Sequence, residues 1–319
     1  MNNNIIPIFF TISNNFSPFL AVAIKSMLEN ADSKYFYNIH IVHENDLTSE
    51  NKDKLLSLKT DNSNIIFNEM NSILDVIKDN DDTKLREDYF SLAIFFRIFI
   101  PTMFKEYDKA IYIDADVCIP GDISKLYNIE LDYNIIGGCI DKSIVGIKPI
   151  EEYFTNVVGV DYREYINSGV LLLDMKRLRE LEFDKHFLYL FDKYHFNNVD
   201  PDQAYINAMC KGKIKYLDNI WDTMPNKNES IIDNPMIIHY NLFLKPWHYD
   251  NVGYEEYFWE YAKKTPYYDE IKEIKANYSE FDKKKDDECL DAMLTKCNEL
   301  LNDEVTFKKV FESGMEQRL

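Results

Sequence analysis

The stretch KAIYIDADVCIPGD, residues 109–122, decides how the rest of the chain is interpreted. Its apolar residues 110–113 stop at Asp114 and Asp116, and Pro120–Gly121 then turns the chain. A short run rich in β-branched and aromatic residues between turn signals predicts a buried strand. Residues i and i+2 of a strand point to the same side, so the two carboxylates can converge at its carboxyl end. Open α/β sheets bind their ligands at that end.

Two chemical interpretations of Asp114 and Asp116 remain open at this point. Two ionised carboxylates that point at one place repel each other unless a cation lies between them. Hard oxygen ligands favour Mg²⁺ or Mn²⁺, ions that usually complete their coordination with substrate phosphates. In the other interpretation, both aspartates only cap the turn that follows the strand.

Length and charge limit the classes of function. The 319 residues suffice for one large α/β domain with an appendage or for two modest domains. The net charge of −19 argues against a nucleic-acid partner and against more than peripheral contact with a membrane surface. The five cysteines form no CxxC motif, which is typical of free thiols in a reducing cytoplasm. Since no segment approaches the ~20 apolar residues that span a bilayer, we expect a soluble, cytoplasmic protein.

The amino-terminal part alternates between two kinds of pattern. Strands are predicted at residues 5–10, 37–43 and 65–67, with helices between them, the second at residues 48–59. This alternation predicts a parallel, doubly wound sheet. The strand-to-helix corner at residues 11–16 is then the natural place for a nucleotide, although the chain has neither GxGxxG nor a Walker lysine motif.

Arg97 lies in an apolar helix predicted at residues 91–99 and ended by Pro101, after a polar loop at residues 78–88. An arginine on an apolar helix is rarely buried without a partner. Either its head reaches water, or it anchors an anion or the two aspartates.

The later predicted segments follow in chain order. A strand is predicted at 134–140, and an irregular loop at 142–162 could serve as a substrate lid. A strand follows Asn167-Ser-Gly, and one long helical region covers 175–195. Residues 200–203 open another helix with Asp200 or Asp202 as its cap, and strands follow at 214–217 and 236–239. Beyond residue 250 the chain becomes acidic and helical. We expect a catalytic domain at 1–250 and a helical extension at 251–319, whose apolar stripe packs on the main domain or on a partner, such as a second copy of the chain.

Several motifs occur in a consistent order: a first-helix segment at 19–26, Arg97, YIDADV at 112–117, NSGVLL at 167–172, Asp202–Gln203, His239–Tyr240 and KPWH at 245–248. In these motifs, from residue 5 to about 250, the chain resembles glycosyltransferase family 8, retaining enzymes of the GT-A fold, and especially the bacterial lipopolysaccharide galactosyl- and glucosyltransferases. The resemblance implies an α/β fold, a Rossmann-like mixed sheet with helices on both faces, followed here by the helical extension.

The resemblance also implies a reaction and its residues. A hexose would pass from UDP-glucose or UDP-galactose to a saccharide, glycolipid or glycoprotein acceptor, with release of UDP and with Mn²⁺, or Mg²⁺ in its place, as cofactor. The implied metal ligands are Asp114, Asp116 and His239, and a nitrogen ligand beside two carboxylates also fits Mn²⁺ better than Mg²⁺. The implied donor contacts further include Lys245, Thr11, Asn15, Phe16, Ala115, Asn167 and Ser168, with Arg97, Asp141, Asp202 and Gln203 around the sugar; Ser13 replaces an aspartate common in the family.

The identity of Gln203 bears on the mechanism. Retaining glycosidases place a carboxylate nucleophile under the anomeric carbon, whereas the resemblance puts Gln203, a poor nucleophile, at about that place. We therefore expect front-face displacement, in which a phosphate oxygen of the leaving UDP helps to deprotonate the acceptor. Two alternatives remain open: a metal-dependent nucleotidyltransferase, which would release pyrophosphate, and a catalytically silent protein that binds nucleotide sugars.

Overall fold

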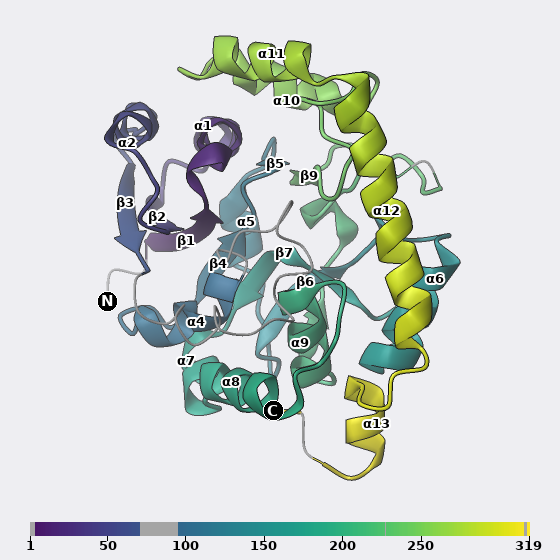
Figure 1. Cartoon of the computed structure of the whole chain (residues 1–319). Coiled ribbons are helices and arrows are strands. Elements are labelled where there is room, and N and C mark those ends of the chain that lie inside the picture. The colour runs from purple at the N-terminus through teal and green to yellow at the C-terminus, as the bar shows by residue number, and fades with distance from the viewer. Residues whose placement is uncertain (1–3, 71–94, 227, 316–317) are drawn as a thin grey trace.

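Apolar segments of the chain form a seven-stranded sheet at the centre of the computed structural model (Figure 1). The structure describes residues 4–70, 95–226, 228–315 and 318–319. In spatial order the strands are β3 (Ser63–Glu69), β2 (Phe36–His43), β1 (Ile5–Ile12), β4 (Ala110–Ile113), β7 (Ile166–Leu173), β6 (Ile136–Ile140) and β8 (Ile214–Tyr216). A separate ladder pairs β5 (Val117–Cys118) with β9 (Ile238–His239).

The directions of the strands make the sheet mixed. β1 lies parallel to β2 and β4, and β2 lies parallel to β3, which confirms the parallel arrangement predicted for residues 5–67. β7 runs antiparallel to both of its neighbours, β4 and β6. β4 and β7 are buried at every position, which explains the continuous apolar runs at residues 110–113 and 170–173.

Helices cover both faces of the sheet and create two hydrophobic cores. Successive side chains of a strand point to opposite faces, so Phe9 of β1 belongs to one core and Ile8 and Phe10 to the other. The first core is covered by α4 (Phe96–Met103), α6 (Lys148–Tyr153), α7 (Met175–Glu180), α8 (Phe183–Tyr194), α9 (Pro201–Cys210) and α13 (Phe307–Glu312). The second is covered by α1 (Ser17–Asn30), α2 (Ser49–Leu56), α5 (Ile123–Tyr127), α10 (Glu255–Ala262) and α11 (Tyr268–Asn277). The predicted Rossmann-like sheet with helices on both faces is confirmed.

The segment 142–162 is not the irregular loop that the sequence analysis predicted. It contains α6 and a π-helix, Phe154–Val158. The buried residues of these two helices lie at positions 150, 153, 154, 157 and 158, a helical spacing that outweighs the glycines and proline nearby. Pro149 lies in the first turn of α6, where proline is tolerated, and Gly159 ends the π-helix with a φ of +83°.

Other predicted boundaries also differ. The region 175–195 forms two helices, α7 and α8, because Glu182 between them adopts a left-handed φ of 52°. Pro101 lies inside α4 and does not end it; burial of this apolar helix in the core outweighs the hydrogen bond that proline forgoes. The predicted strand at 236–239 is shorter and pairs with β5, outside the main sheet. The predicted loop at 78–88 lies outside the described residues.

The carboxyl-terminal helices pack on the main sheet assembly. α12 (Glu280–Leu300) is the long helix that runs beside α6 in Figure 1 and leads to α13. Cys297 and Leu300 of its apolar stripe are buried in the first core, and Met293, Leu294 and Leu301 pack against that core. The predicted packing of this stripe on the main domain is therefore confirmed.

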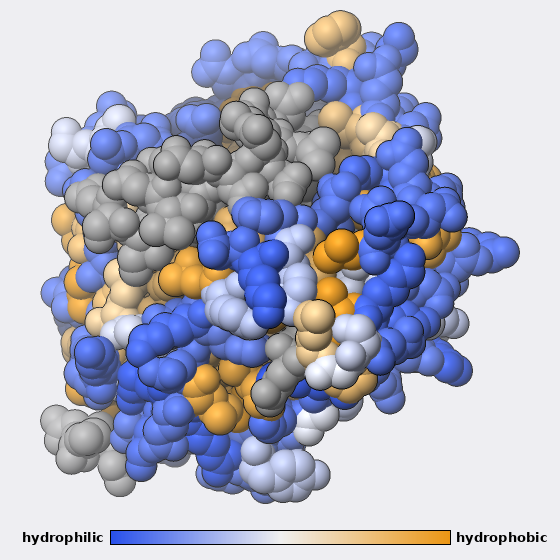
Figure 2. All heavy atoms as spheres, turned by 60° about the horizontal axis from the view of Figure 1, so that its bottom comes forward, coloured by the Kyte–Doolittle hydropathy of each residue, from blue (hydrophilic) through white to orange (hydrophobic). Residues whose placement is uncertain are grey.

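Among the described residues, none of the helices combines the length and the apolar character needed to cross a membrane. The coloured part of the face in Figure 2 is mainly hydrophilic, and hydrophobic residues form separate groups on it.

Candidate active site

The metal-ligand candidates come from three short segments that backbone pairing joins. Asp114 follows β4, Asp116 precedes β5, and His239 ends β9. The β5–β9 ladder places Val117 opposite His239, and the N–H of Tyr240 donates to the carbonyl of Asp116 over 2.9 Å. One ligand atom from each of Asp114, Asp116 and His239 lies within 4.8 Å of the others.

The distances within this cluster suit a shared cation. Nε2 of His239 lies 3.3 Å from Oδ1 of Asp116 and 4.0 Å from Oδ2 of Asp114. Neighbouring ligands of an octahedral ion with bonds of about 2.1 Å lie about 3 Å apart, so only small side-chain adjustments are required. One imidazole and two carboxylates form a donor set that suits Mn²⁺ and related divalent ions.

Lys245 neutralises part of the acidic charge. Its ammonium donates to Oδ2 of Asp116 and to the carbonyl of Tyr240. Although burial opposes ionisation, Lys245 and His239 hold the pKa of Asp116 well below its usual range. The Asp116 carboxylate is therefore ionised, as a metal ligand must be.

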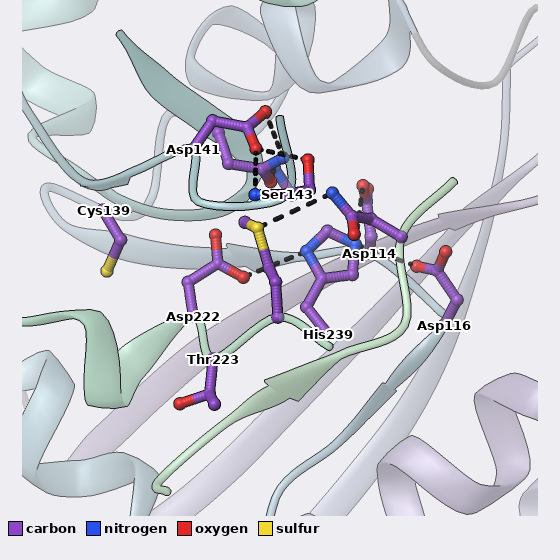
Figure 3. Close-up of polar contacts among 12 residues, drawn as sticks. Asp114, Asp116, Cys139, Asp141, Ser143, Asp222, Thr223 and His239 are labelled. Carbon is purple, nitrogen blue, oxygen red and sulfur yellow. Dashed lines mark hydrogen bonds and ion pairs between the residues drawn. The ribbon is translucent and has the colours of Figure 1, made fainter. Parts of the chain in front are cut away.

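His239 has a second partner on the far side of its ring. Figure 3 shows Asp222 joined to the imidazole of His239, with Nδ1 3.0 Å from Oδ1. Although burial favours the neutral ring, the carboxylates of Asp116 and Asp222 raise the pKa of His239 to about 10. Burial raises the pKa of Asp222 to about 6, although His239 opposes that shift. Sequence reasoning missed Asp222.

Arg97 anchors Asp114, the first of the two aspartates after β4, together with Asp202 of α9. Only 5% exposed, it donates to Oδ1 of Asp114 over 2.9 Å, and its Nε lies 3.1 Å from Oδ2 of Asp202. It also donates to the carbonyl and hydroxyl oxygens of Ser168 over 2.7 and 3.0 Å. The alternative in which its head reaches water is wrong. The ring of Tyr112 lies 4.5 Å from its guanidinium carbon, and the Tyr112 hydroxyl donates to Asp114 over 2.6 Å.

A second group of polar side chains surrounds Asp141. The side-chain amides of Asn167 and Gln203 donate to its Oδ2 over 3.2 and 3.1 Å, and Ser143 donates to its Oδ1 through both N–H and hydroxyl. Oε1 of Gln203 accepts from the N–H of Ser168 over 2.9 Å. Ser143 was not singled out in the sequence, because it lies in the segment predicted to be a loop.

Asp200 occupies the N-cap position of α9, as predicted, but its side chain makes no capping hydrogen bond. Its carboxylate accepts from the hydroxyls of Tyr153 and Tyr165 over 2.8 and 2.5 Å. Asp202 accepts from the hydroxyl of Ser168 over 3.0 Å and pairs with Arg97. Burial raises the pKa of Asp202, and Arg97 opposes this shift.

One cavity of about 1010 Å³ brings the predicted site residues together. Its lining includes Thr11, Asn15, Phe16, Arg97, Asp114, Ala115, Asp116, Asp141, Asn167, Ser168, Asp202, Gln203, His239 and Lys245. It also includes Cys289, Met293 and Lys296 of α12, which the sequence analysis treated as a packing helix. Met293 belongs to the apolar stripe that packs on the first core and also lines the cavity, so the stripe and the cavity wall adjoin on α12.

Comparisons with known proteins bear on this cavity. A family model described as Glycosyl transferase family 8 matches residues 7–251. The lipopolysaccharide 1,2-glucosyltransferase of Escherichia coli K12 is 27% identical over 173 residues, which cover 50% of this chain and 50% of that protein. Glycosyltransferase GlyB of Streptococcus pneumoniae serotype 4 is 26% identical over 273 residues, which cover 80% of this chain and 61% of GlyB. The chain thus spans between half and three fifths of the length of these two curated relatives.

Solved structures share the fold. The galactosyltransferase LgtC, in complex with donor and acceptor sugar analogs, superposes with a TM-score of 0.70 at 22% identity and covers 82% of this chain and 96% of that one. The bifunctional glycosyltransferase WbbM superposes with a TM-score of 0.71 at 20% identity and covers 86% of this chain and 52% of that one. At these identities the likeness shows the fold alone.

Proposed function

The chain belongs to glycosyl transferase family 8, as its motifs predicted, and on that premise we propose that it transfers a hexose from a UDP-sugar to a saccharide, glycolipid or glycoprotein acceptor. UDP-glucose and UDP-galactose are the proposed donors, and Mn²⁺ is the proposed cofactor. The observation that carries this proposal is the convergence of Asp114, Asp116 and His239 in the cavity that also contains Lys245.

Different residues of the cavity would bind the cation, the diphosphate and the nucleoside. A divalent cation held by Asp114, Asp116 and His239 would offset negative charge on the diphosphate as the bond to the sugar breaks. The ammonium of Lys245 lies beside these ligands, paired with Asp116, and can offset further negative charge on the leaving phosphate. The corner at Thr11, Asn15 and Phe16 lines the same cavity, and we assign the nucleoside to it, with Phe16 stacking on uracil.

The contacts around the proposed sugar position support front-face displacement. Both ends of the Gln203 side-chain amide are bound, to Asp141 and to the N–H of Ser168. Asp202 is held by Arg97 and Ser168. Side chains fixed in this way are suited to orienting sugar hydroxyls and poorly suited to attacking the anomeric carbon. A covalent sugar adduct isolated on Asp141, Asp202 or Gln203 would overturn this mechanism.

The proposal extends to the domains, the cellular compartment and the oligomeric state. We assign residues 1–250 to the catalytic domain and 251–319 to a helical extension that also supplies one wall of the cavity. None of the five cysteines forms a disulfide, which supports a reducing cytoplasm as the site of action. Association of two copies through the carboxyl-terminal region stays a prediction.

A donor screen tests the proposed function. UDP release is measured with Mn²⁺ across UDP-sugars, with a chelator as the metal-free control. We expect release from UDP-glucose or UDP-galactose, its loss in Asp114→Asn, and its retention in Asp132→Asn. Asp132 is exposed and pairs with Lys215, away from the cavity lining, so the control removes one carboxylate charge of the same kind.

The outcomes separate the alternatives. Pyrophosphate released from a nucleoside triphosphate would favour a nucleotidyltransferase. UDP binding without release of UDP from any donor would favour a silent binding protein.

A further inference from the structure

Asp222 lies directly behind His239, the proposed nitrogen ligand, and is completely buried. It follows the short 3₁₀ helix Asn219–Trp221, and the next residue, Thr223, forms a β-bridge with Ile238. The N–H of His239 donates to the carbonyl of Thr223 over 2.8 Å. Backbone pairing therefore fixes the Asp222 side chain against the imidazole, as Figure 3 shows.

Burial of the Asp222 carboxylate destabilises the folded state. One oxygen accepts from Nδ1 of His239 over 3.0 Å, whereas the other, Oδ2, is buried and has no hydrogen-bond partner among the described residues. A buried acceptor without a partner costs about 1–3 kcal/mol, and more when it is charged. A residue that the fold holds at such a cost is a candidate for a functional role.

The role follows from what a carboxylate can do to an imidazole. An ionised carboxylate only accepts hydrogen bonds, so it keeps a proton on Nδ1 and leaves the lone pair of a neutral ring on Nε2. Nε2 is the nitrogen that lies 3.3 Å from Asp116 and 4.0 Å from Asp114. Histidine ligands of metals commonly donate their other ring N–H to a carboxylate, which fixes the ring and raises its basicity as a ligand.

We propose that Asp222 is a positioning residue that orients His239 and fixes its proton for binding of a divalent cation by Asp114, Asp116 and His239. This inference rests on the proposed function, which assigns the cation to these three ligands. It adds a residue that the chain's motifs do not single out and that touches none of the substrate positions assigned above.

Metal binding by the whole chain, without nucleotide, tests the inference. Mn²⁺ is titrated calorimetrically into wild type, Asp222→Ala and Asp222→Asn. Loss of such an outer partner typically weakens metal binding by 10–100-fold, and we expect a loss in that range for Asp222→Ala. Asp222→Asn nearly preserves the shape of the side chain, but its carboxamide can accept from or donate to Nδ1, so we expect a smaller loss.

A matched control removes the same charge from the same segment. Asp218 is exposed and caps the 3₁₀ helix by accepting from the N–H of Ile220. Asparagine caps helices as well as aspartate does, so Asp218→Asn should bind Mn²⁺ as wild type does. Thermal unfolding of the metal-free proteins verifies that each variant is folded, and the near-isosteric Asp222→Asn keeps the test decisive if Asp222→Ala does not fold.

The results separate this inference from the function on which it rests. Weaker Mn²⁺ binding in the folded Asp222 variants, with unchanged binding in Asp218→Asn, supports the positioning role. Binding within twofold of wild type in folded Asp222→Ala, or in Asp222→Asn if the alanine variant does not fold, overturns that role and leaves the proposed function in place. Failure of wild type to bind Mn²⁺ or Mg²⁺ overturns the cation site and the positioning role together.

Discussion

Replacing Gly169 by alanine tests whether the proposed metal ligands must stay where the structure holds them. Gly169 lies in the regular strand β7, and its carbonyl accepts from the N–H of Asp114 over 2.7 Å. A Cβ atom added to Gly169 would lie 2.3 Å from Cε1 of His239 and 2.7 Å from Oδ2 of Asp114. Since non-bonded carbon atoms settle about 3.5–4.0 Å apart, the imidazole must retreat by about 1 Å or more.

The expected magnitude follows from that displacement. Metal–ligand distances tolerate deviations of about 0.2 Å, so a shift of about 1 Å removes His239 as an effective ligand. We expect Mn²⁺ affinity to fall at least tenfold, the lower end of what disturbing an outer partner costs, with a matching loss of UDP release. Overpacking of this kind costs about 1–3 kcal/mol of folding free energy, so the variant should still fold.

Calorimetric Mn²⁺ titration and thermal unfolding measure the two effects separately. Gly253→Ala is the matched control, because its added methyl would make an ordinary contact of 3.4 Å with Cβ of Pro225. The control should match wild type in both measurements. Wild-type Mn²⁺ affinity in a folded Gly169→Ala variant would refute the steric argument and the tight ligand geometry behind it.

Three further predictions concern other parts of the site and its surroundings. Arg97→Met leaves two buried or half-buried carboxylates without their cation, and urea unfolding should show a loss of about 3–5 kcal/mol; a loss below about 1 kcal/mol would contradict the anchoring role. Burial and the charge of Lys245 lower the pKa of His248 to about 4. The folding stability that the neutral imidazole contributes is therefore fully present above the ordinary pKa of 6.5 and is lost as the pH falls toward 4. His248→Phe, which can keep the stacking on Tyr278, should flatten the urea-unfolding profile between pH 7 and 4, and an unchanged profile would contradict this assignment. Cys289 lines the cavity and is the one cysteine of the five that is not buried, so a maleimide should label it first by mass spectrometry and a UDP-sugar with Mn²⁺ should slow the labelling; equal rates would place the donor away from α12.

Local patterns in the sequence predicted the features that depend on local geometry. The apolar run that stops at Asp114 and Asp116 predicted a buried strand with acidic residues at its carboxyl end, and β4 ends there. The apolar helix around Arg97 required a partner for a buried cation, and Asp114 and Asp202 supply it. The strand and helix periods of residues 5–67 likewise sufficed for the parallel part of the sheet.

Features that depend on long-range pairing were missed. The β-bridge between Thr223 and Ile238 brings Asp222 next to His239. The sequence around Trp221–Asp222 has no periodic pattern that would indicate this contact. The face of α12 that lines the cavity carries mixed residues, so only its apolar stripe was visible in the sequence. In the segment 142–162, glycine and proline concealed the helical spacing of its buried residues.

The short ladder between β5 and β9 has a consequence for how the protein acquires activity during synthesis. It joins Val117 to His239, segments far apart in the chain, and closing so large a loop is slow and entropically costly. Every strand of the seven-stranded sheet precedes His239 in the chain, so a nascent polypeptide can assemble that scaffold while it still lacks the imidazole. The cation site proposed at Asp114, Asp116 and His239 would then be completed late in folding, and an unfinished chain would lack one of its three ligands.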